Sequence, residues 1–120
     1  MADRFDQFHG QVTAYPFTFT GTDAVNIVPA ATGVVQIPVY GYITCGGGST
    51  ALSITDTGGT SLSNGTAGGM MIDKGIVFGY SPYGVLKAST VSTGINMQST
   101  VAGATLSGCL MVKAEKQSYS

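Results

Sequence analysis

Regular alternation of apolar and other residues between Val35 and Cys45 is the feature that most constrains the fold of this chain. A repeat of two residues is the period of a β-strand that places one face on a core. The odd positions are apolar and the even ones mostly are not: Val35, Ile37, Val39, Gly41, Ile43 and Cys45, against Gln36, Pro38, Tyr40, Tyr42 and Thr44. Because proline has no N–H to donate, Pro38 predicts an open edge or a bulge in this strand.

Similar patterns recur along the chain. Near its end, one face of a second strand is formed by Leu106, Gly108, Leu110, Val112 and Ala114. Shorter segments predict further strands at 15–20, 25–27, 52–55, 70–72, 76–80, 84–88 and 94–98, separated by turn-forming residues. Glycine supplies 18 of the 120 residues, and each interior glycine costs a helix about 1 kcal/mol relative to alanine. The sequence therefore predicts an all-β protein, a β-sandwich or jelly roll of about eight short antiparallel strands.

The start of the chain is more polar and charged than the body. We interpret residues 1–11 as an extended N-terminal arm, residues 12–116 as one β-sandwich domain and residues 117–120 as a short C-terminal tail. The start lacks the pattern of a signal peptide, and no apolar run approaches the roughly 18 residues of a spanning helix. We therefore expect synthesis in the cytoplasm, with no signal peptide and no membrane partner.

Charged side chains are rare in the body. Between Ala24 and Val112 there are four: Asp56, Asp73, Lys74 and Lys87. Charged residues make up 9% of the whole chain, against about 25% in an average domain. A surface of hydroxyls, backbone and aromatic rings favours close contact with other proteins, because few charges must be desolvated on association. The net charge of −1, without a basic cluster, argues against nucleic-acid binding.

One short motif suggests catalysis. Asp56-Thr57-Gly58 resembles the active-site turn of homodimeric aspartic proteases, in which one Asp from each subunit activates water. That family places an apolar residue before the Asp, where this chain has Thr55. The alternative is a tight turn in which Asp56 binds nearby backbone and Gly58 or Gly59 adopts positive φ. We favour the turn and expect no enzyme activity.

Other chemistry-bearing residues are few. His9 is the single histidine, so neither a zinc site of several imidazoles nor a Ser-His-Asp triad is expected, and we predict no cofactor or metal. Cys45 and Cys109 are interpreted as two small buried thiols, although a disulfide would be possible if their strands were neighbours. Four tyrosines are candidates for an interface, because tyrosine buries much area at low entropic cost: Tyr40, Tyr42, Tyr80 and Tyr83. The alternative is that these rings cap the ends of the sandwich.

The closing strand, Gly108-Cys109-Leu110-Met111-Val112, leads into Lys113-Ala114-Glu115. Together with the hydroxyl- and glycine-rich body and the polar arm, it resembles the small capsid decoration (cement) proteins of tailed bacteriophages. The resemblance implies a non-enzymatic jelly roll or β-sandwich that binds the outside of the expanded head and associates as trimers or dimers.

The sequence thus predicts a virion structural protein that stabilises the major capsid protein lattice from the capsid surface. We expect a homo-oligomer, with a trimer favoured over a dimer. Arm contacts to the lattice are assigned to Arg4, Phe5 and Phe8. An alternative is a phage fibre knob or carbohydrate-binding module in which the four tyrosines stack on sugar rings. A more remote alternative is the homodimeric aspartic protease using Asp56.

Overall fold

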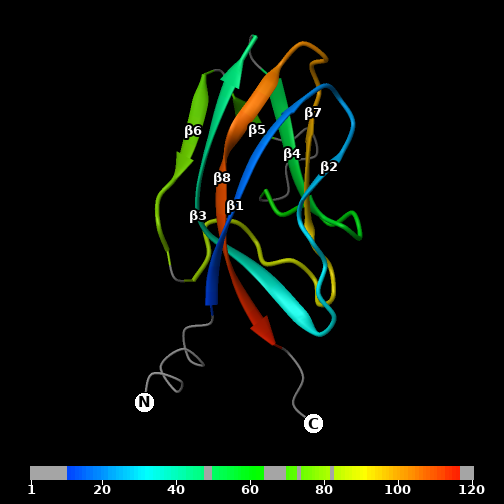
Figure 1. Cartoon of the computed structure of the whole chain (residues 1–120), viewed down its shortest axis with the longest axis vertical. Coiled ribbons are helices and arrows are strands. Elements are labelled where there is room, and N and C mark those ends of the chain that lie inside the picture. Colours follow the sequence, from blue (N-terminus) through cyan, green and yellow to red (C-terminus); the bar gives the residue numbers. More distant parts are fainter. Residues whose placement is uncertain (1–10, 48–49, 64–69, 73, 82, 117–120) are drawn as a thin grey trace.

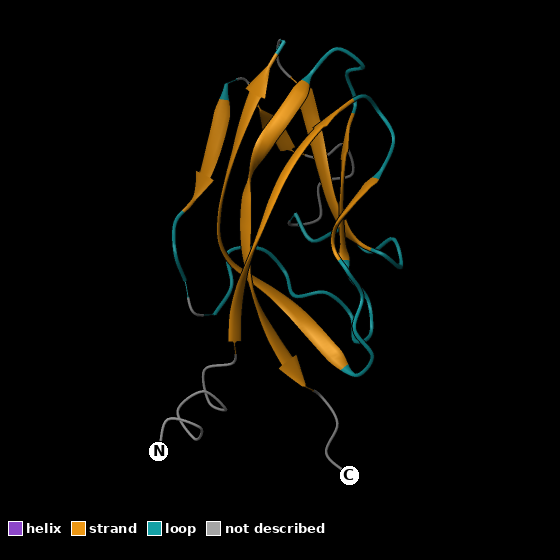
Figure 2. Cartoon of the chain, viewed as in Figure 1, coloured by secondary structure: helices purple, strands orange, loops and turns teal. Residues whose placement is uncertain are grey.

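The computed structural model describes residues 11–47, 50–63, 70–72, 74–81 and 83–116. Within these ranges the protein is all-β, with eight antiparallel strands and no helix (Figures 1 and 2). The strands are β1 (Gln11–Thr20), β2 (Val25–Val28), β3 (Val34–Gly46), β4 (Thr50–Asp56), β5 (Met70–Ile72), β6 (Gly75–Phe78), β7 (Ile95–Ser99) and β8 (Thr105–Lys116). No helix in the described ranges could cross a membrane.

The strands form two four-stranded sheets. Sheet A has the order β1-β8-β3-β6 and sheet B the order β2-β7-β4-β5. The chain folds back on itself as one long hairpin, so that β1 pairs with β8, β2 with β7, β3 with β6 and β4 with β5. Two further pairings, β3 with β8 and β4 with β7, complete the sheets. Figure 1 shows β1 and β8 side by side along most of their length.

The core is built from the inward-facing residues of both sheets. Sheet A contributes Phe19, Ile43, Leu106, Leu110 and Val112, and sheet B contributes Ile27, Val28, Leu52, Ile54, Ile95 and Met97. Burying each of the larger side chains stabilises the fold by about 1.5–3 kcal/mol. At one point the backbones approach too closely for any side chain: a Cβ on Gly108 would collide with the Tyr42 carbonyl. This contact explains why glycine interrupts the apolar face of β8.

The predicted bulge at Pro38 is present, and it changes which residues of β3 are buried. In the pairing with β8, Pro38 lies opposite Val112 and Tyr40 opposite Met111, which leaves Val39 as the extra residue. The buried residues are therefore even-numbered before the bulge, as at Gln36, and odd-numbered after it, as at Ile43. The prediction of one continuous apolar face from 35 to 45 is wrong in its first part, because an extra residue moves the alternation to the other face.

The prediction of a strand at 84–88 is also wrong. These residues belong to a long loop (79–94) that follows the side of β3 not paired with β8. Ser89 and Gln36 are joined twice: the Ser89 N–H donates to the Gln36 carbonyl, and the Gln36 N–H donates to Ser89 Oγ. The Pro38 carbonyl accepts from Val85 N–H, but Pro38 has no N–H to return. A regular two-way ladder cannot form there, yet the loop still covers this edge.

Candidate interaction surface

Cross-strand register arranges the outward side chains of sheet A in five rows. Side chains alternate between the two faces of a strand, so the residues between the core positions of β1, β8, β3 and β6 point away from sheet B. The first three rows are Val12–Lys113–Ile37, Ala14–Met111–Tyr40 and Pro16–Cys109–Tyr42–Val77. The last two are Thr18–Ser107–Thr44–Gly75 and Thr20–Thr105–Gly46.

The first three rows, apart from Lys113, form a surface that we call the apolar band. It consists of Val12, Ala14, Pro16, Ile37, Tyr40, Tyr42, Val77, Cys109 and Met111. Three of its large side chains are well exposed: Val77 at 67%, Val12 at 44% and Tyr42 at 42%. Tyr42 and Val77 lie directly opposite each other on β3 and β6. Exposed apolar side chains that are contiguous in this way are typical of protein contact sites.

The last two rows carry hydroxyl groups that already have partners within the sheet. Thr18 Oγ1 donates to Ser107 Oγ at 3.1 Å, and a 2.8 Å hydrogen bond joins the hydroxyls of Thr20 and Thr105. Thr44 Oγ1 donates to the Ser107 carbonyl at 3.1 Å. This part of the face therefore needs no further polar partner.

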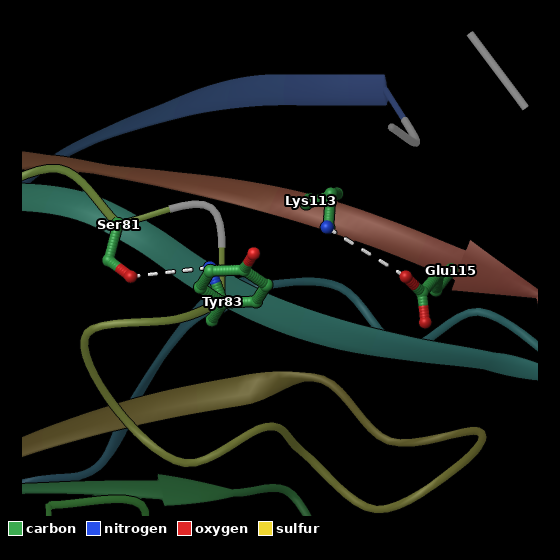
Figure 3. A network of polar contacts seen from close by, with 4 residues as sticks. All are labelled: Ser81, Tyr83, Lys113 and Glu115. Carbon is green, nitrogen blue, oxygen red and sulfur yellow. Dashed lines mark hydrogen bonds and ion pairs between the residues drawn. The ribbon is translucent and has the colours of Figure 1, made fainter. Parts of the chain in front are cut away.

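The charges on the outer face of sheet A compensate each other. Lys113 Nζ lies 3.8 Å from Glu115 Oε2; Lys113 lies in the first row, between Val12 and Ile37, and Glu115 follows it on the same face of β8. Figure 3 shows this ion pair on β8, with the Ser81–Tyr83 turn alongside β3, the neighbouring strand. The pair has no net charge, and its Lys113 side chain is only 14% exposed.

The predicted interface tyrosines are found around β3. Tyr40 and Tyr42 belong to the apolar band, Tyr40 being half-buried. Tyr80 and Tyr83 lie in the loop after β6 and are 67% and 93% exposed. The loop is held by Ser81, whose N–H donates to the Val39 carbonyl at 2.9 Å. Arg4, Phe5 and Phe8, the predicted arm contacts, lie outside the described residues.

On β2, β4 and β7, the outward side chains of sheet B are mostly polar and none is charged. Asn26 Nδ2 donates to Asn96 Oδ1 at 2.9 Å and to the Val28 carbonyl at 3.0 Å. Gln98 Nε2 donates to the Thr22 carbonyl at 2.9 Å. The amides of this face are thus used inside the molecule.

Asp56 ends β4 and is 1% exposed. Its Oδ1 accepts from the N–H groups of Gly58 and Thr60, each at 2.9 Å, and its Oδ2 accepts from Thr90 Oγ1 at 2.8 Å and Thr90 N–H at 3.2 Å. Burial alone would raise the pKa of Asp56, but these hydrogen bonds together outweigh burial and lower it. Gly59 adopts a φ of 97°. The expected tight turn is confirmed, and the carboxylate also ties it to the 79–94 loop, a contact that the local sequence did not indicate.

The two cysteines are thiols on different faces of sheet A, although their strands are neighbours. Cys45 packs against the core, whereas Cys109 lies in the apolar band. Both are thiols, as predicted, but they are half-buried rather than buried. Within the described residues, no three His, Cys, Asp or Glu side chains gather as a metal site would require.

Comparison with protein-family models, with curated proteins and with solved structures finds no match to this chain. Its function must therefore be inferred from its own geometry. The strongest candidate site is the outer face of sheet A, which joins residues from four strands into one neutral, partly apolar surface.

Proposed function

We propose that the two sheets form a jelly roll, the architecture of many viral capsid and lectin domains. The supporting observation is the strand order, 1-8-3-6 in one sheet and 2-7-4-5 in the other. This order results when the chain forms one long hairpin, with β1–β4 in one arm and β5–β8 in the other, and the hairpin then curls so that each arm gives two strands to each sheet. Buried residues from both sheets meet in one core, as a sandwich requires.

We further propose that the protein is a virion structural component that decorates the phage head and cements neighbouring major capsid protein subunits. The observation that carries this proposal is the neutral apolar band, a surface suited to protein contact and poorly suited to catalysis. Residues 1–11 reach onto the capsid lattice in this proposal. A protein of this kind acts by bridging, because each contact it makes on the lattice raises the energy needed to separate two capsid subunits.

Binding and heating of purified heads test this proposal. Expanded heads that lack a decoration protein are mixed with the purified chain, sedimented and then heated. We expect the chain to co-sediment at a fixed ratio to the capsid protein and to raise the temperature at which heads break. Absence of the chain from the pellet, at concentrations where it is folded, would rule out the cement function.

Carbohydrate recognition is a second candidate, favoured by the exposed rings of Tyr80 and Tyr83 beside β3. Aromatic rings that project from a loop can stack on the apolar faces of sugars. A glycan array distinguishes the candidates: specific binding that is lost in both Tyr80→Ala and Tyr83→Ala would favour this second function over the first.

A further inference from the structure

We infer that the apolar band of sheet A is the contact between two copies of this chain, packed face to face. The inference rests on the proposed function in one respect, that the band is a protein contact. It adds the identity of the partner on this surface, which leaves the remainder of the molecule for the capsid.

The open edge of sheet A is unsuited to adding a strand from a second copy. β1 is ten residues long, and β8 is its partner among the described strands. The β1–β8 register continues unshifted through Pro16 and Cys109. Proline would interrupt the ladder if its nitrogen faced β8, so the Pro16 nitrogen must point to the open edge. Its ring blocks a further strand there, a common protection of edge strands. The other edge strand, β6, has only four residues, so the face offers a second copy the larger contact.

The charges on this face allow contact with an identical surface. A two-fold contact brings the same patch of both copies together, so an uncompensated charge near the axis would meet its own image and repel it. Lys113, which lies between Val12 and Ile37 in the first row, is paired with Glu115 of its own chain, and the nine apolar residues around it carry no charge. The hydroxyl rows are already bonded within the sheet, so they lose little on desolvation.

The size of the face suits a reversible dimer. Strands lie about 4.8 Å apart and alternate residues about 6.7 Å apart, so the five rows together cover roughly 550 Å² per copy, of which the apolar band is roughly 300 Å². A contact centred on the apolar band that extends over all five rows would bury about 1,100 Å² in two copies, close to the lower limit for specific interfaces. We therefore expect association in the micromolar range rather than an obligate dimer.

Light scattering after size exclusion tests the inference without any capsid, over concentrations from about 1 to about 500 µM. We expect the mass of the full chain to rise from 12.2 kDa towards twice that value. Tyr42→Lys and Val77→Lys place charges in the band and should weaken association about tenfold or more. Gln98→Lys, on the exposed outer face of sheet B, is the matched control and should associate like the wild type.

The native thiol of Cys109 provides a second readout that needs no substitution. Its rate of maleimide labelling, followed by mass spectrometry, should fall as protein concentration rises, since the thiol lies within the proposed contact. A wild type that stays monomeric throughout, a trimer, a Tyr42→Lys variant that associates normally, or a labelling rate independent of concentration would each overturn the inference. A monomer that still binds heads would overturn this inference alone and leave the cement function standing.

Discussion

The outer faces of sheets A and B both carry few charges, but they differ in how their uncharged side chains are used. On sheet B, the amides of Asn26 and Gln98 donate to partners within the molecule. On sheet A, Val77 and Tyr42 remain well exposed. Low charge alone therefore does not identify a contact surface. The informative difference is that sheet A leaves large apolar side chains exposed, and this is why we propose sheet A as the contact surface.

The largest effects should come from the inner faces, where the two sheets are alike. Leu110→Ala in sheet A and Ile54→Ala in sheet B each remove a side chain that is at most 1% exposed. We expect each to lower the free energy of unfolding by about 3 kcal/mol, measured by urea denaturation. A much smaller loss in one of them would show that the asymmetry between the sheets extends into the core.

Asp56→Asn should have the next largest effect, because sheet B relies on this buried carboxylate. The amide NH₂ would face backbone or hydroxyl donors, so we expect a loss of about 2 kcal/mol at pH 7. The folded-state pKa of Asp56 is lowered, so its contribution is fully present above the ordinary aspartate pKa of about 4 and is lost as pH falls through the lowered value. Urea denaturation at pH 7 and at a pH below the lowered pKa of Asp56 should show that the wild type and the variant differ in free energy of unfolding at pH 7 and become similar in acid. An equal difference at both would contradict the proposed role.

Asn26→Ala tests the outer face of sheet B. It removes the hydrogen bonds to Asn96 and to the Val28 carbonyl, and we expect a loss of about 1 kcal/mol in thermal or urea unfolding. An unchanged stability would mean that water replaces these hydrogen bonds at no cost in free energy. The two outer faces would then differ less than their geometry indicates.

Thr18→Val on sheet A should have the smallest effect. The hydroxyl bond to Ser107 is solvent-exposed, and valine has a high strand propensity, so we expect a change within about 0.5 kcal/mol. In the concentration series by light scattering, the added methyl should leave association unchanged or slightly stronger. Markedly weaker association would contradict the expectation that the hydroxyl rows lose little when they are buried in the contact.

Local patterns predicted much of the fold, but not the surface. Alternation identified the strands that contain Ile43 and Leu110, and Pro38 indicated the bulge, because both signals depend on neighbouring residues. The bulge then reversed the faces of Gln36 and Ile37, an effect that depends on where the extra residue is inserted. Apart from Tyr40 and Tyr42, the apolar band was missed, because Val12 on β1 and Val77 on β6 come to lie on the same face only through the strand order. The Asp56–Thr90 contact was missed for a related reason: it spans 34 residues of sequence.

The position of β8 has a consequence for how the protein is made. β8 is the last strand in sequence, yet it lies between β1 and β3 and provides the partner of both. Until residues 105–116 have left the ribosome, β1 lacks the strand that holds it in the sheet. Translation at about 5–20 residues per second leaves the earlier strands waiting several seconds with apolar faces exposed. Sheet A therefore cannot be completed before β8 has been synthesised, and a truncated product that stops before β8 cannot assemble it.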